Sequence, residues 1–222
     1  RGVREAAQDQ GCRRAQPFGR PLAIAARPPL LITSGDPAGI GPRAVVLALR
    51  RGAAHKVCEP VLVGERSVWR RAGWTPSLAA LLETNLGAAA PAYGRATATT
   101  GRLSFAALAL ALRALGQRQA GALVTAPISK KAWSLAGVPH RDHTEWLRCE
   151  PGADGQMVLG LPARGLWAAL ATRHVPLASV SRLLSPASVL AAALALAAAL
   201  RALGRGHARL GLCAFNPHAG ED

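Results

Sequence analysis

The sequence is poor in lysine and in aromatic side chains, and these shortages argue against a nucleic-acid-binding protein. Lysine occurs only at Lys56, Lys130 and Lys131, although the formal net charge of the 222 residues is +15. Aromatic residues make up 4% of the chain, which is too few for a platform on which single-stranded bases stack. Because the positive charge is almost all arginine, spread along an alanine-rich chain, we expect no nucleic-acid partner.

Paired cysteines and long apolar runs are also missing. The four cysteines are widely spaced and form no Cys-x-x-Cys pair, so neither a zinc ribbon nor a disulfide scaffold is indicated, and a reducing, cytoplasmic location is expected. The longest apolar run, residues 189–200, is too short to cross a bilayer. We therefore interpret it as a buried helix and expect no membrane partner.

Residues 1–29 have the composition of an irregular, arginine-rich tail. The chain starts with Arg rather than Met, and the pair Arg13-Arg14 precedes a short apolar stretch at residues 22–26. That stretch is too brief for the apolar region of a twin-arginine signal. We therefore expect residues 1–29 to be an irregular tail, or sequence upstream of the true start, and no part of the predicted fold.

From residue 30 onward, short apolar runs alternate with helical stretches. The pattern predicts strands at residues 30–33, 61–63, 122–125, 167–172 and 210–215, and helices at residues 43–51, 67–82, 101–119 and 186–204. Ser185 and Pro186 have the N-cap and first-turn positions of the last helix. Alternating strands and helices are typical of a three-layer α/β/α fold with a largely parallel sheet.

A glycine-rich segment, residues 33–42, follows the first predicted strand. Glycines let the backbone approach an anion, and the N-terminus of the following helix adds a partial positive charge. The segment matches a relaxed dinucleotide fingerprint, Gly39-x-Gly41-x-x-Ala44, with Glu65 at about the expected distance for a ribose contact. A purely structural turn between strand and helix explains the same residues, so both interpretations stay open.

Two further segments carry groups that can bind an anionic or polar substrate. Lys130 and Lys131 follow a predicted strand, where an ammonium group can pair with a phosphate or carboxylate. His143 and Thr144 offer a donor and acceptor pair, and His143 can transfer a proton. Solvated lysines, and a polar loop with Thr144 as a helix cap, are the structural alternatives.

Two histidines end apolar runs and precede or enter proline-containing turns: His174 and His218. Neutral imidazoles can hold a divalent metal and leave coordination positions open for substrate oxygens. No third ligand is obvious from the spacing. A metal site and a pair of structural histidines therefore both stay possible at this point.

Five strings in sequence order identify a resemblance. They are Ile-Thr-Ser-Gly-Asp-Pro-Ala-Gly-Ile-Gly-Pro (32–42), Thr-Ala-Pro-Ile-Ser-Lys (125–130), Ala-Gly-Val-Pro (136–139) with His-Thr-Glu (143–145), Ala-Thr-Arg-His-Val-Pro-Leu (171–177) and Asn-Pro-His-Ala-Gly-Glu (216–221). In this order they resemble the 4-hydroxythreonine-4-phosphate dehydrogenases, the PdxA family of pyridoxal phosphate biosynthesis.

The resemblance implies a fold like that of isocitrate and isopropylmalate dehydrogenases, in a homodimer with the active site near the subunit interface. It implies that His143 and Thr144 bind the phosphorylated substrate and that His174 and His218 bind zinc, magnesium or cobalt. NAD or NADP is the implied cofactor, and Lys130 is a candidate catalytic residue. The family's third metal histidine lies beyond the last residue here, so residues 30–222 correspond to about the N-terminal two thirds of a family member.

The implied reaction oxidises 4-phosphohydroxy-L-threonine to 2-amino-3-oxo-4-phosphooxybutanoate, which loses carbon dioxide to give 3-amino-2-oxopropyl phosphate. Two residues depart from the family pattern: Arg43 replaces an acidic residue, and Asp142 replaces a glycine. Asp142 should weaken the binding of an anionic substrate unless Arg141 offsets its charge. Alternatives are a dehydrogenase of 4-phospho-threonate or erythronate, an inactive truncated remnant, and a basic nucleic-acid-binding module.

Overall fold

A computed structural model describes residues 27–147, 156–161 and 165–216 of the chain. The chain divides into two compact units, Arg1–Trp146 and Leu147–Asp222.

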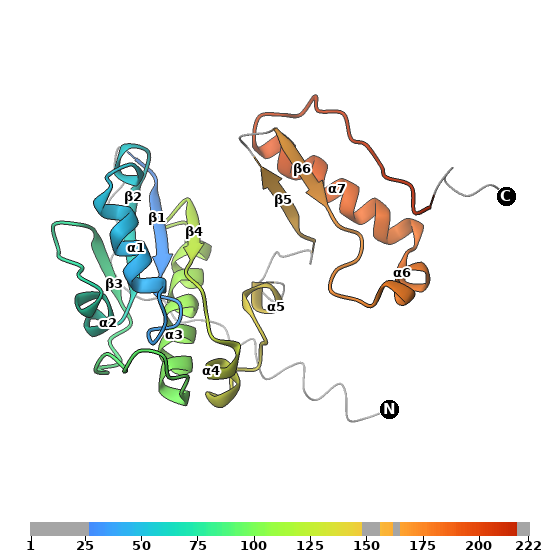
Figure 1. Cartoon of the computed structure of the whole chain (residues 1–222). Helices are drawn as coiled ribbons and strands as arrows, with labels where there is room; N and C mark the ends of the chain where they lie inside the picture. Colours follow the sequence, from blue (N-terminus) through green and yellow to red (C-terminus); the bar gives the residue numbers. More distant parts are fainter. Residues whose placement is uncertain (1–26, 148–155, 162–164, 217–222) are drawn as a thin grey trace. The chain divides into compact units, whose positions relative to one another are not determined.

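The first unit is built on a four-stranded parallel sheet (Figure 1). Its strands are β1 (Pro29–Thr33), β2 (Glu59–Gly64), β3 (Ala80–Glu83) and β4 (Ala122–Thr125), in the order β3-β2-β1-β4. Leu31 of β1 lies in register with Val61 of β2 and Leu123 of β4. Since β1 pairs with both neighbours in parallel, the loops that follow β1 and β4 leave the same edge of the sheet side by side.

Helices cover both faces of this sheet, as the sequence predicts. They are α1 (Gly41–Arg50), a 3-10 turn (Ala54–Lys56), α2 (Arg66–Arg71) and α3 (Ala98–Gly116). Alternate residues along β1 and β2 face opposite ways. One face packs against α3 through Leu31, Val61, Val63, Ala111 and Ala114, and the other packs against α1 and α2 through Ile32, Leu62, Val46, Leu49 and Trp69. Figure 1 shows α1 and α3 on opposite sides of the sheet, which confirms the three-layer α/β/α fold.

A close contact between α3 and α4 (Lys130–Leu135) fixes the segment after β4. A Cβ atom at Gly101 would lie 2.0 Å from the carbonyl oxygen of Ala132, so only glycine lets the two helices approach this closely. The indole Nε1 of Trp133, a fully buried residue, donates a hydrogen bond to Ser104 Oγ at 3.1 Å. This packing holds α4, and the short helix α5 (His143–Leu147) after it, on the core of the first unit.

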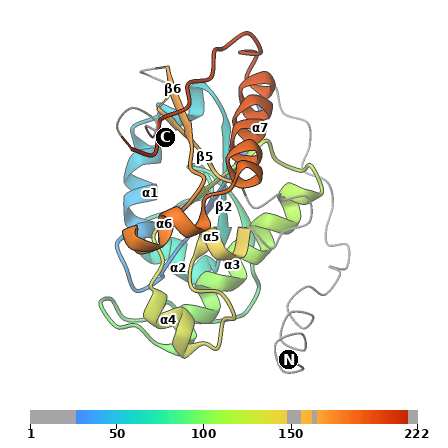
Figure 2. The ribbon, with the colours of Figure 1, turned by 90° about the vertical axis from the view of Figure 1, so that its right-hand side faces the viewer.

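The second unit consists of an antiparallel hairpin and two helices. Strands β5 (Val158–Leu161) and β6 (Leu166–Ala169) pair with each other, and α6 (Leu177–Leu183) and α7 (Pro186–Ala202) follow. Helix α7 lies along the hairpin (Figure 2). It begins with the predicted Ser185 cap, part of a reciprocal capping box with Ser188, and is followed by Gly204 at a φ of 73°.

Two predicted elements are wrong, and a third is a strand in a different sheet from the one expected. Residues 67–82 do not form one helix, because α2 ends at Arg71, Gly73 takes a φ of 94°, and β3 begins at Ala80. Residues 167–172 contain a strand as predicted, β6, but it does not extend the parallel sheet, because it pairs with the preceding β5 in a local antiparallel hairpin. Residues 210–215 form no strand, and in the described part of the chain their apolar side chains have no partner strand and lie exposed.

The apolar helix α7 is less buried than its sequence predicts. Ala192 and Leu200 are buried, whereas Leu190 and Leu194 are 58% and 57% exposed. The helix is apolar nearly all round, but the two-stranded hairpin has too small a surface to cover it. In the described residues no single helix is long and apolar enough to cross a membrane, and α6 and α7 reach that length and composition only as a pair bent by 94°.

Candidate functional site

The loops after β1 and β4 are in direct contact at the carboxyl edge of the sheet. The backbone N–H of Asp36 donates to the carbonyl oxygen of Pro127 at 2.8 Å. A Cβ atom at Gly35 would lie 2.3 Å from that same oxygen, and Gly35 has a φ of 62°. Two independent features therefore require glycine at this position: the backbone conformation and the close approach of the second loop. Ligands of parallel α/β sheets bind at this edge.

The glycine-rich loop also makes its own turn into α1. The carboxylate of Asp36 accepts a hydrogen bond from the N–H of Ala38 at 3.0 Å, and its carbonyl oxygen accepts one from Gly39 at 3.0 Å. An aspartate that bonds its own backbone two residues on makes an Asx turn. The position of Asp36 is thus set by its own side chain and by Pro127.

Arg71 of α2 holds the glycine-rich loop from the other side. Its two terminal nitrogens donate to the carbonyl oxygens of Pro37 and Pro91, and its guanidinium lies 4.0 Å from the ring centroid of Tyr93. The N–H of Gly94 donates to the carbonyl oxygen of Ala38 at 2.8 Å. Arg71 therefore ties the segment between β3 and α3 to the loop after β1.

Glu65 is a structural residue, which contradicts its interpretation as a ribose ligand. It is 5% exposed. One carboxylate oxygen accepts hydrogen bonds from the Thr84 hydroxyl at 2.7 Å and the Leu86 N–H at 3.1 Å, and the other accepts from the Gly87 N–H at 3.1 Å. A buried carboxylate satisfied in this way stabilises the loop after β3. The dinucleotide fingerprint therefore lacks its acidic partner, because Glu65 is already engaged.

Lys130 lies at the start of α4, where its ammonium pairs with Asp142. The distance from Lys130 Nζ to Asp142 Oδ2 is 3.1 Å, and Asp142 Oδ1 accepts a hydrogen bond from the N–H of Glu145 at 3.0 Å. These contacts hold the pKa of Asp142 below its usual value, the Glu145 N–H having the larger effect and Lys130 the next. Lys130 thus offsets the charge of Asp142, the part that the sequence suggested for Arg141.

His143 and Thr144 open α5, and His143 packs against the core of the first unit. Its ring centroid lies 5.7 Å from that of Trp133, with an angle of 81° between the planes. Burial lowers the pKa of His143, an effect that the nearby Asp142 carboxylate opposes. Its Nε2 is buried and has no hydrogen-bond partner among the described residues. Burial therefore favours the neutral imidazole over the charged one, and Nε2 is a buried polar atom without a partner among the described residues.

Three of the five sequence motifs thus meet in the first unit. The glycine-rich loop contacts the loop after β4 through Gly35 and Pro127, and that loop leads to Lys130, which reaches Asp142 beside His143. Thr144 follows on the same short helix. Lys131 is exposed and makes no ion pair within the described residues. The structure brings together the predicted substrate-binding segments.

The predicted metal ligands are not brought together in the described residues. His174 lies in the second unit, in the turn between β6 and α6, and has a φ of 51°. A non-glycine residue in the left-handed region is strained and is often found at functional positions. His218 lies outside the described residues. Within the described residues, no three His, Cys, Asp or Glu side chains are grouped so that they could hold a metal ion.

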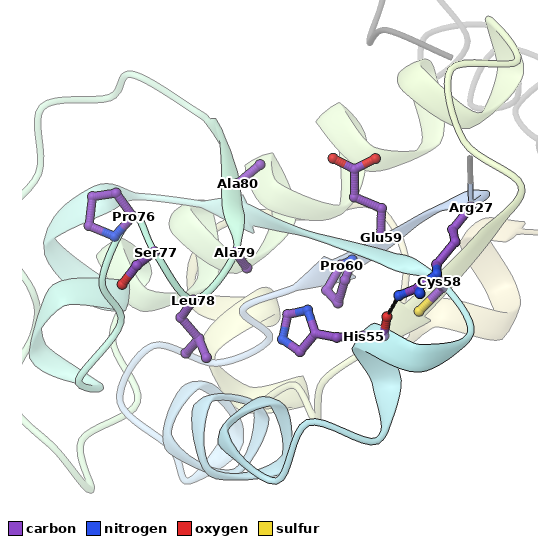
Figure 3. Close-up of a pocket in the computed structure, with 10 residues that line it drawn as sticks. All are labelled: Arg27, His55, Cys58, Glu59, Pro60, Pro76, Ser77, Leu78, Ala79 and Ala80. Atoms are coloured by element: carbon purple, nitrogen blue, oxygen red, sulfur yellow. Dashed lines mark hydrogen bonds between the residues drawn. The ribbon is translucent and has the colours of Figure 1, made fainter. Parts of the chain in front are cut away.

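A separate hollow of about 610 Å³ lies at the opposite edge of the sheet (Figure 3). Residues at the amino ends of β2 and β3 and just before them line it, among them His55, Cys58 and Glu59. Arg27, which also lines it, donates a hydrogen bond to the carbonyl oxygen of His55. The candidate site at the carboxyl edge and this hollow are therefore different places.

Sequence reasoning missed Arg71 and the role of Asp142. The two carbonyl partners of Arg71 lie 20 and 34 positions away, and no local pattern predicts such contacts. The sequence marks Asp142 as a departure with an unfavourable charge, but its lysine partner stands 12 positions earlier. The Asp-x-x-Glu spacing before a helix could have indicated that Asp142 caps α5.

Comparisons with known proteins agree with this arrangement. Residues 56–222 match the family model described as the pyridoxal phosphate biosynthetic protein PdxA. A 4-hydroxythreonine-4-phosphate dehydrogenase from Synechocystis is 33% identical over 214 residues, which include 88% of this chain and 61% of that protein. The chain therefore spans about three fifths of the length of this relative.

Solved structures give the same result. A 4-hydroxythreonine-4-phosphate dehydrogenase from Burkholderia phymatum superposes with a TM-score of 0.75 at 25% identity, covering 88% of this chain and 65% of that one. A terephthalate 1,2-cis-dihydrodiol dehydrogenase from Burkholderia xenovorans gives a TM-score of 0.63 at 29% identity, covering 87% and 63%. With the match of the family model over most of the sequence, these findings show that the chain belongs to the PdxA family.

Proposed function

We propose that this chain provides the substrate-binding part of a dehydrogenase that oxidises 4-phosphohydroxy-L-threonine to 2-amino-3-oxo-4-phosphooxybutanoate. Loss of carbon dioxide then gives 3-amino-2-oxopropyl phosphate. Membership of the PdxA family supports this function, as does the name of the Synechocystis relative. One observation carries the proposal. His143 and Thr144 are connected to the loops after β1 and β4 through the Lys130–Asp142 ion pair and the hydrogen bond between Asp36 and Pro127.

On this proposal His143 and Thr144 bind polar groups of the substrate. The buried Nε2 of His143 has no partner among the described residues, and an unsatisfied buried polar atom costs free energy that a bound ligand can offset. The lowered pKa favours the neutral ring, and a neutral imidazole can donate through one nitrogen and accept through the other. Thr144 adds a hydroxyl that donates or accepts.

NAD or NADP completes the proposal as the hydride acceptor, since oxidation of a hydroxyl-bearing carbon must deliver a hydride. A divalent metal such as zinc, magnesium or cobalt would polarise the substrate oxygens when bound, and His174 and His218 are its proposed ligands. The described residues hold only one of these two histidines and no group of three ligands.

Formation of NADH or NADPH with 4-phosphohydroxy-L-threonine tests the proposal, together with calorimetric binding of the same substrate. We expect His143→Ala and Thr144→Val to weaken substrate binding at least tenfold, because each loses a hydrogen bond to a charged or polar group. Thr99→Val, an exposed threonine at the start of α3, is the matched control. Absence of both turnover and binding in the unmodified protein would contradict the proposal.

The metal and the homodimer need their own measurements. We expect zinc binding, followed by calorimetry, to weaken in His174→Ala and His218→Ala but to remain in His207→Ala, an exposed histidine of the second unit. A proposed homodimer with its active site near the subunit interface predicts twice the chain mass in light scattering. Equal zinc affinity in the unmodified protein and the three variants would contradict the proposed metal ligands. A monomer at every concentration would contradict the proposed homodimer.

A dehydrogenase of 4-phospho-threonate or 4-phospho-erythronate is the second candidate. The structural neighbour from Burkholderia xenovorans, which is named for a dihydrodiol, indicates that this fold accommodates more than one hydroxylated substrate. Asp142 distinguishes this chain from the common family pattern beside the same motif. The NADH or NADPH assay decides between the candidates when all three phosphorylated compounds are compared at equal concentration.

A further inference from the structure

The carboxylate of Asp142 links two helices that carry the candidate site. One oxygen pairs with the ammonium of Lys130 on α4 at 3.1 Å, and the other accepts the backbone N–H of Glu145 on α5 at 3.0 Å. The carboxylate thus connects the amino end of α4 to the first turn of α5. His143 and Thr144 are the first two residues of that turn.

The apolar side of α5 is already fixed by aromatic packing. Trp146 stacks on Phe105 of α3 with a centroid distance of 4.2 Å, and Trp133 contacts both Trp146 and His143 edge to face. These rings determine how deep α5 lies on the core. Asp142 adds polar contacts at the end of α5 where His143 and Thr144 lie, one to Lys130 and one to the N–H of Glu145.

We propose that Lys130 is a positioning residue that acts on the His143–Thr144 segment through Asp142 and does not itself contact the substrate. The ammonium holds the Asp142 carboxylate in place and neutralises it, so that an anionic substrate approaching His143 meets a neutral pair. The inference rests on the proposed function only in taking His143 and Thr144 as substrate contacts. It reassigns Lys130, which the sequence suggested as a catalytic candidate.

A titration of Asp142 tests the link without any substrate. The carboxyl carbon of Asp142 is followed by NMR against pH in the unmodified protein, in Lys130→Met and in Lys131→Met. Lys131 is the neighbouring exposed lysine of the same helix and is the matched control. We expect the pKa of Asp142 to rise in Lys130→Met and to stay unchanged in Lys131→Met. An unchanged pKa in Lys130→Met would overturn the proposal.

A double-mutant cycle then separates an indirect from a direct role. Calorimetry measures binding of 4-phosphohydroxy-L-threonine to the unmodified protein, Lys130→Met, Asp142→Asn and the double variant. We expect Lys130→Met alone to weaken binding about two- to fivefold, as the loss of a partly exposed ion pair allows. In the Asp142→Asn background the same change should have no effect, because the carboxylate on which it acts is gone.

A lysine that contacts the substrate would lose the same factor in both backgrounds, and that result would overturn the proposal. If the unmodified protein binds no 4-phosphohydroxy-L-threonine, the proposed function fails. The titration of Asp142 still decides whether Lys130 pairs with Asp142, the contact on which the positioning role depends, because it requires no ligand.

Discussion

The two units bury their apolar residues very differently. In the described residues, every buried apolar side chain except Ala192 and Leu200 belongs to the first unit. There the sheet is covered on both faces, and fully buried residues such as Trp69 and Trp133 fill the layers. In the second unit a hairpin of two four-residue strands faces a 17-residue apolar helix. Two strands with one helix cannot enclose a core of comparable size.

This difference determines how the predicted site residues are supported. His143 lies against Trp133, whose indole is hydrogen-bonded to Ser104 in the core. His174 lies in an exposed turn with a left-handed backbone and is not part of a core cluster. A position held by a packed core keeps its geometry without a ligand, whereas a position in a turn depends on local contacts. We therefore expect the first unit to control substrate-site geometry.

Matched leucine truncations test the contrast directly and should give the largest effect. Leu108 of α3 is 1% exposed, and Leu194 of α7 is 57% exposed. We expect Leu108→Ala to lower the free energy of unfolding by about 2–5 kcal/mol, because it leaves a cavity in a packed core. Leu194→Ala should change it by less than about 0.5 kcal/mol. Urea unfolding followed by tryptophan fluorescence and circular dichroism measures both.

The two leucines are matched in size and in helical context, so propensity contributes equally to both variants. Equal losses would mean that α7 is buried in solution against a surface that the second unit does not itself provide. Such a result would remove the contrast between the two units.

Disrupting the contact between the loops after β1 and β4 should give the next largest loss of unfolding free energy. We expect Gly35→Ala to cost about 1–3 kcal/mol, because its Cβ would lie 2.3 Å from the Pro127 carbonyl oxygen and its φ is 62°. Gly52→Ala is the control, since Gly52 has a φ of 75° and a Cβ atom added there would meet no atom within 4 Å. The difference between the two variants in unfolding free energy isolates the clash from the backbone strain.

Substrate binding should respond more strongly than stability to Gly35→Ala, because the change separates two loops of the candidate site. A similar loss of stability in both glycine variants, with substrate affinity intact, would show that the loops tolerate separation.

The central strands and the long helices were predictable because their signals are local. Residues 122–125 form a strand as predicted, and Ser185 caps α7 as its position before Pro186 indicates. The fold class followed from the alternation of such elements, and it is confirmed. Burial of α7 was not predictable, because an apolar helix requires partner surface that its own sequence does not specify.

The candidate site was predictable only as separate segments. Motif order identified His143 and Thr144, whereas the Lys130–Asp142 pair joins the first residue of α4 to the residue before α5, and no local pattern predicts a contact over 12 positions. For Glu65 the sequence suggested a role that the structure does not support. Its distance from the glycines suggested a ribose ligand, but its carboxylate accepts hydrogen bonds from the backbone of the loop after β3. Spacing along the chain does not reveal whether a polar group is already satisfied.

The cap of α7 provides a smaller test within the second unit. Ser185 Oγ accepts the N–H of Ser188 at 3.1 Å, and the Ser188 hydroxyl accepts the N–H of Ser185 at 3.0 Å. We expect Ser185→Ala to lower the unfolding free energy of this helix by about 1 kcal/mol. Ser181→Ala, an exposed serine within α6, should leave it unchanged. Circular dichroism during urea unfolding measures both variants, and equal values would exclude a contribution of the capping box.

The titration of His143 should have the smallest effect on the free energy of unfolding. It tests whether the core of the first unit extends to His143. Burial lowers its pKa below the usual 6.5, so the unfolded chain binds more protons than the folded one around that pH. Stability from the neutral ring is therefore complete above pH 6.5 and is lost as the pH falls toward the folded-state pKa. We expect the unfolding free energy of His143→Asn to depend less on pH between about 7.5 and 5.5 than that of the unmodified protein.

The control is His207→Asn, at an exposed position, which should keep the pH dependence of the unmodified protein. Identical pH profiles for both variants would mean that the ring stays hydrated, and the core of the first unit would then end at α4.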